Sequence, residues 1–321
     1  MKTISRDYAV TVWLRPSPSN QWTPRWGHAD GLQLGLEPAD GPRGLIRVYA
    51  SYIDRSRLLN FVAIEPIVAR QTERGYSELE HSSLDNVPGK RFWSSGDVND
   101  ATPRPTADAR PGVIETIDGH ECLTVYVFSE RFDNGAEVAV RVRFRDDRPH
   151  QVALAAFRLN GSAELAHCVL SATMGNYARL RQLHLNDGIV TPEQLWPGFS
   201  GTDFTEHARF PLDSLTRDGD TAGAYATPDE SDPQSASYAP GVAEHWKYTG
   251  VRAKQGWRAV HPSPEAAVQV NARATYWASA SPIPAGPAFE NFEFIDTFRS
   301  GQEYVYYAEP CDTDGTAPVG W

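Results

Sequence analysis

The chain has 321 residues, of which 40% are hydrophobic and 22% are charged, a balance typical of a globular protein with a buried core. Its formal net charge is -11, the wrong sign for a protein that binds nucleic acid through its phosphates. Its three cysteines, Cys122, Cys168 and Cys311, are too widely spaced for a zinc knuckle and too few for a disulfide framework, so we expect free thiols.

The N-terminal segment contains one apolar run, from Ala9 to Leu14, which is interrupted by Thr11 and ended by Arg15 and Pro16. This run is too short for the hydrophobic region of a signal peptide or for a membrane span. We therefore expect a soluble protein with no membrane partner, cytoplasmic as the sequence stands and extracellular if a leader was removed. A homo-oligomer is compatible with these features.

Apolar and polar residues alternate with a period of two along most of the chain, and helical periodicity is almost absent. The runs are rich in β-branched and aromatic residues, which favour strands. The predicted strands, in chain order, are Tyr8 to Leu14, Gly44 to Ile53, Asn60 to Val68, Gly112 to Ile117, Glu121 to Phe128, Ala136 to Arg145, Gln151 to Arg158, Leu165 to Thr173, Tyr177 to Leu185, Gly250 to Val260, Ala267 to Trp277, Phe289 to Phe294 and Glu303 to Tyr307. This pattern predicts an all-β protein, a single large antiparallel β-sandwich over residues 1–321.

One short helix is predicted at Thr191 to Trp196, because Thr191 can cap the first turn and Pro192 suits the first helical position. Two stretches are predicted as long loops, residues 94–111 with three prolines and residues 214–241 with many small and polar residues. Loops of this length in a compact domain often have a function.

Arginines alternate with apolar residues in two of the predicted strands. The set comprises Arg141, Arg143 and Arg145 in one strand and Arg179 and Arg181 in another. Guanidinium groups form forked hydrogen bonds with carboxylates, so these arginines could bind an acidic saccharide. The alternative is a solvent-exposed face whose arginines pair with acidic residues of neighbouring strands.

Tryptophan is abundant, with nine in the chain, and several lie in loops or at strand ends. An indole ring can stack on a sugar ring while its polar neighbours bind the hydroxyl groups. The candidates are Trp93, Trp196, Trp246, Trp257 and Trp277, of which we expect one or two to face a ligand, because most tryptophans pack against the core.

Gln182 and His184 fall on one face of a predicted strand, so an amide and an imidazole can reach a single ligand group. An imidazole can accept a proton near neutral pH, which makes His184 a candidate catalytic base. Glu290 is predicted to point to the same side as Phe292 and Phe294. Burial there would raise its pKa, as a general acid or base requires, although a structural buried glutamate is an equal alternative.

The sequence gives little support for a metal or cofactor site. His81 falls on the face opposite Glu78 and Glu80, and no pair of histidines has ligand spacing, so we expect no metal site. Binding of calcium by the carboxylates of residues 97–108 or 218–232 is kept as an alternative. The chain also lacks G-x-S-x-G, Walker, G-x-G-x-x-G and H-E-x-x-H motifs, which argues against serine hydrolases, nucleotide enzymes and zinc proteases and for the absence of a cofactor.

Three segments resemble, in order, motifs of the jelly-roll alginate and glucuronan lyases. They are Ser77-Glu78-Leu79-Glu80, Gln182-Leu183-His184 and Tyr304-Val305-Tyr306, with Trp93 between the first two. Glu80 replaces an arginine of that family, and the Lys, Gly and Gln of its last motif are absent. The resemblance implies that Glu78 lines the substrate site, that Gln182 and His184 neutralise a uronate, and that Tyr304 or Tyr306 protonates the leaving oxygen.

A second resemblance is to the galactose mutarotase-like supersandwich proteins. It is carried by the run Phe61 to Pro66 and by Phe289-Glu290 followed by Gly301-Gln302. The paired histidines of true mutarotases are absent. This resemblance implies a supersandwich fold and a catalytic Glu290.

The sequence thus predicts a protein that acts on a saccharide, most simply a lyase that cleaves an acidic saccharide by β-elimination. Arg179, Arg181 and Gln182 would neutralise the uronate while His184 or a tyrosine removes the proton. One alternative is a glycoside hydrolase or sugar epimerase that pairs Glu290 with Glu65 or Glu78. Another is a saccharide-binding or structural subunit without catalysis.

Overall fold

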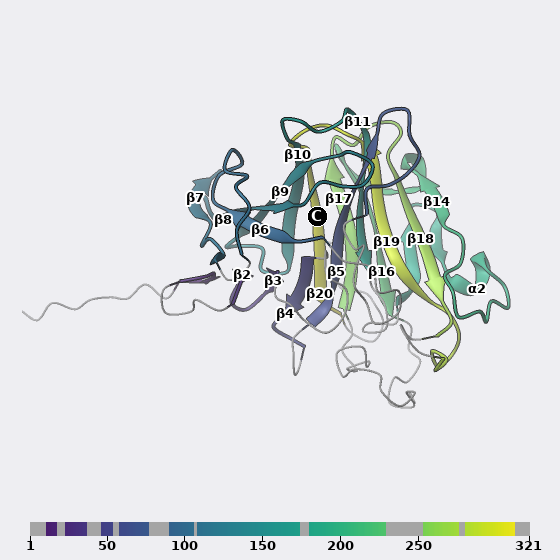
Figure 1. The fold of residues 1–321 in the computed structure, drawn as a ribbon. Coiled ribbons are helices and arrows are strands. Elements are labelled where there is room, and N and C mark those ends of the chain that lie inside the picture. The colour runs from purple at the N-terminus through teal and green to yellow at the C-terminus, as the bar shows by residue number, and fades with distance from the viewer. Residues whose placement is uncertain are drawn as a thin grey trace, which may run out of the picture.

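The computed structural model describes residues 11–17, 23–36, 46–53, 58–76, 90–105, 108–173, 180–228, 253–275 and 280–311. Within them the chain forms two large antiparallel sheets that pack face to face (Figure 1). The predicted all-β sandwich is confirmed, and its architecture is compatible with the jelly-roll type. The assignment of residues 1–321 to a single domain stays a prediction.

The first sheet has nine strands. In spatial order they are β1 (Trp13–Leu14), β2 (Arg25–His28), β3 (Leu32–Gly35), β4 (Ile46–Ala50), β5 (Leu58–Val68), β11 (Leu165–Thr173), β19 (Ala288–Thr297), β18 (Ala267–Arg273) and β14 (Ala208–Pro211). The central strands β5, β11 and β19 are distant in sequence, so this sheet depends on long-range pairing.

The second sheet has eleven strands. Nine of them follow in the spatial order β13 (Gly188–Val190), β12 (Leu180–Leu185), β16 (Thr221–Pro228), β17 (Ala253–Val260), β20 (Glu303–Pro310), β10 (Gln151–Arg158), β9 (Val138–Arg145), β8 (His120–Ser129) and β6 (Phe92–Ser95). The remaining two are β15 (Thr216–Asp218), which pairs with β16, and β7 (Val113–Ile117), which pairs with β8.

The core lies between the sheets. Phe292 and Phe294 of the nine-stranded sheet and Trp257 and Tyr306 of the eleven-stranded sheet are fully buried in one cluster. The Trp257 indole Nε1 donates a hydrogen bond to the Phe292 carbonyl oxygen at 2.9 Å and so links the sheets. Each such aromatic side chain contributes roughly 1.5–3 kcal/mol through burial. Inward-facing apolar residues at every second position therefore hold the sandwich together.

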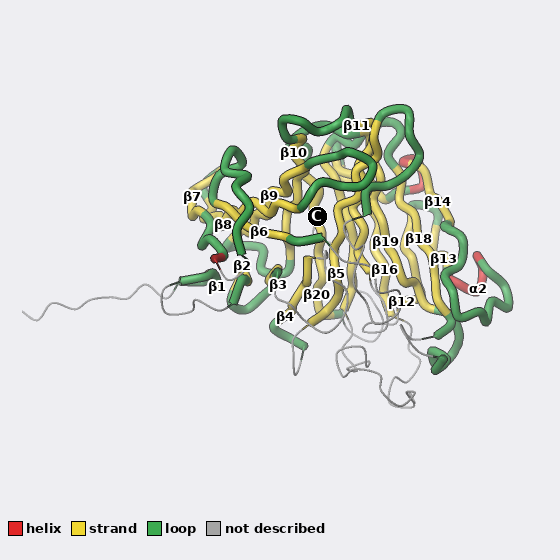
Figure 2. Tube along the Cα trace, viewed as in Figure 1, coloured by secondary structure: helices red, strands yellow, loops and turns green. Residues whose placement is uncertain are grey.

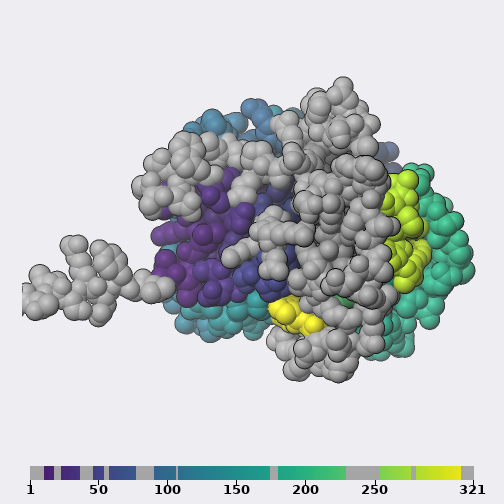
Figure 3. All heavy atoms as spheres, turned by 90° about the horizontal axis from the view of Figure 1, so that it is seen from below, coloured from purple at the N-terminus to yellow at the C-terminus, as the bar shows by residue number. Residues whose placement is uncertain are grey.

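Helix is scarce, as Figure 2 shows. The predicted helix is confirmed as α2 (Pro192–Leu195), and Thr191 caps it through a reciprocal pair of hydrogen bonds with Gln194. One short 3-10 turn, η2 (Leu212–Ser214), is also present. In the view from below, the N-terminal strands and the segment that contains α2 lie on opposite sides of the molecule (Figure 3).

The predicted loop at 214–241 is wrong for its first half, because residues 216–218 and 221–228 form β15 and β16. The β16 sequence alternates Ala and Gly with polar residues and lacks Val and Ile. Its Ala222, Ala224 and Ala226 are fully buried in the core opposite the large residues of the other sheet. Residues 229–241 lie outside the described ranges. The loop at 94–111 is correct apart from its first two residues, which end β6.

Candidate functional site

The outer face of the eleven-stranded sheet carries a stripe of arginines. In β9 the side chains of Val140, Val142 and Phe144 are buried, and those of Arg141 and Arg143 are partly exposed on the opposite side. The alternation predicted for this strand is therefore confirmed. The second arginine strand, β12, is separated from β9 by the four strands β16, β17, β20 and β10, about 24 Å at the usual strand spacing. Arg181 of β12 therefore does not form one patch with Arg141 and Arg143.

An open groove of about 320 Å³ crosses this outer face. It is lined by Arg143, Arg145, Arg148, Gln151, Ala153, Asp218, Thr221, Arg258, Val260, Glu303 and Val305, and we call it the arginine groove. Four arginines face two carboxylates along its walls. In a chain whose net charge is -11, this is a local concentration of positive charge suited to an anion.

The arginines of the groove differ in their partners. Arg145 forms two hydrogen bonds with Asp147, at 2.9 and 2.8 Å, and Arg143 lies 3.5 Å from Glu303. Arg258, which is 7% exposed, instead donates to the neutral Gln151 Oε1. Burial, together with the charge of nearby Arg148, lowers the pKa of Arg258 below its usual value. Among the described residues, Arg258 has no carboxylate within ion-pair distance.

A polar cluster lies on the same outer face at β12, β16 and β17. It consists of Gln182, His184, Tyr225, Thr227 and Lys254, and we call it the His184 cluster. Thr227 Oγ1 donates to Gln182 Oε1 at 3.2 Å, and it lies 2.9 Å from His184 Nε2. Because the Thr227 proton is used on Gln182, His184 must donate from Nε2, which leaves Nδ1 as the basic nitrogen.

The surroundings of His184 favour its neutral form. Burial lowers its pKa, and the positive charge of Lys254 lowers it further. Its ring stacks on the Tyr225 ring with centroids 4.4 Å apart, since the two residues are directly opposite in β12 and β16. Burial also raises the pKa of Tyr225. A neutral base and a protonated phenol therefore lie side by side.

A second tyrosine, Tyr307, lies between Tyr225 and the arginine groove. Tyr307 pairs with Gly256, and Gly256 pairs with Tyr225. Lys254 Nζ lies 5.6 Å from the Tyr225 ring centroid and 5.9 Å from that of Tyr307, and the Arg258 guanidinium carbon lies 6.0 Å from the Tyr307 centroid. The Tyr307 hydroxyl is buried without a hydrogen-bond partner among the described residues. Tyr225 and Tyr307 thus form a row that connects the His184 cluster to the groove.

Gly256 is required for this arrangement. A Cβ at that position would lie 2.4 Å from the end of the Tyr307 ring and 2.7 Å from the Ala224 carbonyl oxygen. We expect Gly256→Ala to destabilise the protein by about 1–3 kcal/mol, because overpacking displaces the buried ring. Urea unfolding of the single variant and of Gly256→Ala combined with Tyr307→Leu checks this. Gly256→Ala should lower the free energy of unfolding less when residue 307 is leucine than when it is tyrosine. Equal losses would mean that the Tyr307 ring does not clash with the added methyl group.

The predicted tyrosines Tyr304 and Tyr306 lie on the other side of the sheet. Both face the core, where the Tyr304 hydroxyl donates to Asp296 Oδ2 at 3.0 Å and the Tyr306 hydroxyl donates to Gln255 Oε1 at 2.6 Å. Period-two alternation along β20 places them opposite Tyr307. They therefore cannot act together with His184 on one ligand.

Arg181 also does not share a ligand site with His184. It lies at an irregularity in the pairing of β12 with β16 and is 6% exposed. Its guanidinium donates to the carbonyl oxygens of Pro284, Gly286 and Pro287. The side chain ties β12 to the segment before β19, so its donors are used within the protein.

Trp93 packs on Phe128 at 6.2 Å and is 7% exposed, so it belongs to a small apolar cluster with Ala139. Four other predicted binding residues, Glu78, Arg179, Trp246 and Trp277, lie outside the described ranges. The structure thus brings together only Gln182 and His184 on one part of the outer face, with Arg143 in the groove and Arg141 beside it.

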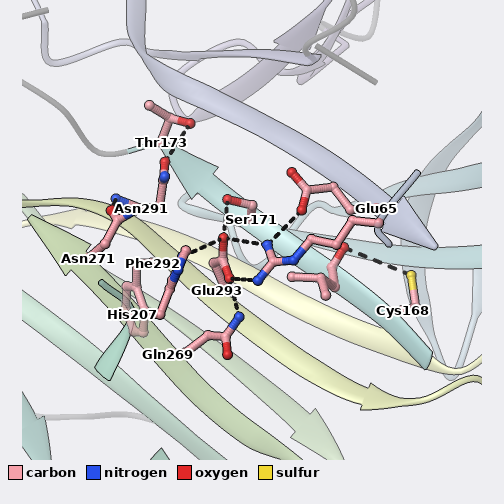
Figure 4. Close-up of polar contacts among 12 residues, drawn as sticks. Glu65, Cys168, Ser171, Thr173, His207, Gln269, Asn271, Asn291, Phe292 and Glu293 are labelled. Atoms are coloured by element: carbon pink, nitrogen blue, oxygen red, sulfur yellow. Dashed lines mark hydrogen bonds and ion pairs between the residues drawn. The ribbon is translucent and has the colours of Figure 1, made fainter. Parts of the chain in front are cut away.

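The outer face of the nine-stranded sheet holds a separate acidic cluster (Figure 4). Arg74 donates to both oxygens of Glu293 at 2.8 and 2.9 Å and to Glu65 at 2.8 Å. Gln269 donates to Glu293 Oε2, and His207 Nε2 lies 3.3 Å from Oε1. We call these residues the Arg74 cluster. Burial alone would raise the pKa of Glu293, but the hydrogen bonds and charges of His207 and Arg74 lower it to about 2. Its oxygens are occupied by protein donors.

Glu290 lies three residues before Glu293, at a bulge where Asn271 of β18 faces two residues of β19. It is 2% exposed, which agrees with its predicted burial, and burial raises its pKa to about 7 despite the opposing charge of Arg273. The bulge puts Phe289 and Phe292 on the same core side, contrary to simple alternation. The suggested partner Glu65 belongs instead to the Arg74 cluster.

One group of described residues has metal-ligand spacing, His120 with Asp146 and Asp147. Arg145 occupies both oxygens of Asp147, so this group is better explained as an ion-pair network. The described parts of 97–108 and 218–232 hold no such group.

Tyr225, Thr227 and Arg258 were not predicted as site residues. Tyr225 and Thr227 lie in β16, whose alanines and glycine favour a loop prediction. Arg258 is a single arginine in β17 and repeats no pattern. Only the pairing of β12, β16 and β17 reveals that these residues are neighbours of His184 and of the groove.

No protein-family model matches the chain, and no curated protein is significantly similar to it. The resemblances to lyases and to mutarotase-like proteins therefore gain no support from relatives. Among the described residues, no helix is long and apolar enough to cross a membrane.

Proposed function

We propose that the outer face of the eleven-stranded sheet binds an acidic saccharide and cleaves it by β-elimination. The observation that supports this most strongly is the excess of guanidinium groups in the arginine groove on the same face as a neutral His184. A polyanionic chain would lie across Arg143 and Arg258 and reach the His184 cluster through the Tyr307 row. The groove floor between the two arginines is formed by Ala153 and Val305, small enough to admit sugar rings.

The reaction requires one base and one acid on the same side of the substrate. His184 Nδ1 accepts the proton from the carbon that bears the carboxylate, and the electron pair of that C–H bond forms the new double bond. The bond to the glycosidic oxygen breaks, and Tyr225 gives its proton to that oxygen. Gln182, whose Oε1 is held by Thr227, has its amide N–H groups left to bind the substrate carboxylate. Solvent then returns the proton from His184 to Tyr225.

The pH dependence follows from the shifted groups. The lowered pKa of His184 keeps it neutral through neutrality, and the raised pKa of Tyr225 keeps it protonated in mild alkali. We expect kcat/KM to be flat across neutral pH, to fall in acid as His184 is protonated, and to fall in strong alkali as Tyr225 ionises.

The test is incubation of the protein with a panel of neutral and uronic-acid oligosaccharides, read by mass spectrometry and near-ultraviolet absorbance. Elimination products absorb and are lighter by one water than hydrolysis products. His184→Ala and Tyr225→Phe should each lower turnover by about 10²–10⁴-fold. Tyr304→Phe is the matched control and should leave turnover unchanged, because Tyr304 faces the core.

Other outcomes would replace this proposal. Hydrolysis products that disappear in Glu290→Gln would favour a hydrolase, and an isomerised sugar of unchanged mass that disappears in the same variant would favour an epimerase. The opposite pKa shifts of Glu290 and Glu293 are the observation that supports this alternative. Saccharide binding without any product, unaffected by His184→Ala, would favour a non-catalytic binding subunit.

A further inference from the structure

Two arginines of the groove converge on one neutral oxygen. Gln151 Oε1 accepts a hydrogen bond from Arg258 Nη2 and another from Arg148 Nη1, at 3.4 Å for the second. The two guanidinium groups are therefore held together by an acceptor that carries no charge. Like charges at such a distance repel, and a neutral amide oxygen offsets little of this repulsion.

The neighbouring carboxylates do not neutralise this pair. Asp147 is engaged on both oxygens by Arg145, and it reaches Arg148 only at 4.0 Å. Glu303 is shared by Arg141 at 3.0 Å and Arg143 at 3.5 Å, and Glu309 is paired with Lys254 at 3.3 Å. Asp218 also lines the groove, but it lies within ion-pair distance of neither Arg148 nor Arg258. The largely uncompensated charge in this half of the groove is thus carried by Arg148 and Arg258, which come from different elements of the sheet.

We propose that Arg148 and Arg258, together with Gln151, form a subsite for a tetrahedral oxyanion, the sulfate or phosphate ester of a saccharide. One guanidinium fork already satisfies the two oxygens of a planar carboxylate. The acceptor lone pairs of a carboxylate lie in one plane, whereas the two forks approach from different elements, the β9–β10 connection and β17. A group with three terminal oxygens matches them better.

This subsite extends the proposed function. The uronate would bind at the His184 cluster, and a sulfate or phosphate ester elsewhere on the same chain would bind in the groove. That the oxyanion belongs to a saccharide rests on the proposed function. That the groove binds an oxyanion depends only on the arrangement of Arg148, Gln151 and Arg258.

The test is titration of the full chain, isotope-labelled at nitrogen, with sodium phosphate and sodium sulfate, each compared with sodium chloride at equal ionic strength. Both oxyanions should shift the side-chain Nε–Hε signals of Arg148 and Arg258. Arg258→Met should weaken binding by about tenfold or more, the usual effect of losing a charged hydrogen bond. Arg158→Met removes one exposed arginine of β10 outside the groove and should leave the affinity unchanged.

Arg258→Met should also fold and raise the urea midpoint in anion-free buffer, because it removes a repulsion between like charges. Should this variant fail to fold, Arg148→Met, at the half-exposed member of the pair, tests the same subsite. Oxyanions that shift these signals no more than chloride does, or variants that bind them as tightly as the wild type, would overturn the proposal.

The nature of the ligand is tested with glucose 6-sulfate, glucose 6-phosphate and glucuronate. Either ester should bind more tightly than glucuronate, and the stronger ester identifies the group. Equal or tighter binding of glucuronate would contradict the tetrahedral subsite. Oxyanion binding without cleavage of any acidic saccharide would reject only the lyase, and cleavage without oxyanion binding would reject only the subsite.

Discussion

Arg74→Met is expected to lower the free energy of unfolding by about 3–5 kcal/mol, the usual cost of removing one partner from a buried ion pair. Arg74 is the shared counterion of Glu65 and Glu293, which are each 2% exposed. Without it, both buried carboxylates would lose a charged hydrogen-bond donor, and Glu293 would keep the partly exposed His207 as a nearby partner. The loss should be largest at neutral pH and should shrink in strong acid, because the lowered pKa of Glu293 stabilises the folded protein only where that carboxylate is ionised.

Urea unfolding at neutral and acidic pH checks this prediction. Arg91→Met is the matched control, because Arg91 forms an exposed pair with Glu130 at 2.6 Å, and it should cost less than about 1 kcal/mol. A loss for Arg74→Met no larger than that of the control would mean that solvent reaches the Arg74 cluster and screens its charges.

Glu290→Gln is expected to stabilise the protein above pH 7 and to leave its stability nearly unchanged below pH 4.5. Burial in the folded protein raises the pKa of Glu290 from 4.5 to about 7. The ionised carboxylate is therefore less favourable in the folded protein than in the unfolded chain. Below pH 4.5 the carboxyl is protonated in both states. Between the two values only the unfolded chain ionises, and stability falls by about 3 kcal/mol in total. Glutamine is neutral and avoids this loss.

The measurement is the urea midpoint of both proteins across this pH range. Glu164→Gln, at an exposed position, removes a carboxylate of the same kind and should show no such pH-dependent gain. A constant difference between Glu290→Gln and the wild type at all pH values would show that the pKa of Glu290 is the same in the folded and unfolded protein. A buried carboxylate with a raised pKa is also a common feature of functional sites.

Local pattern explains much of what the sequence predicted correctly. Alternation in 136–145 requires that Val140 and Val142 face one side and Arg141 the other, because successive side chains of a strand point to opposite faces. The cap formed by Thr191 and Gln194 depends on residues three positions apart and is likewise local.

The candidate site depends on contacts that local pattern does not encode. Period two places Tyr304 and Tyr306 on one face of β20 and Tyr307 on the other, but only the packed sandwich shows that the first face is the core. The irregular pairing at Arg181 removes that residue from the row of Gln182 and His184. The alanines and glycine of β16 do not predict a strand, yet its Tyr225 stacks on His184.

The sequence by itself determined the all-β class, most strand positions, the short capped helix and the arginine stripe of β9, because each depends on residues within a few positions of one another. The tertiary structure alone decided which strands are neighbours. It separated Arg181 from the arginines of β9 by four strands, and it brought Arg258 beside Arg148 and Tyr225 beside His184. Such pairings join segments far apart in the chain, and their energy comes from packing and hydrogen bonds that exist only after the sheets have formed.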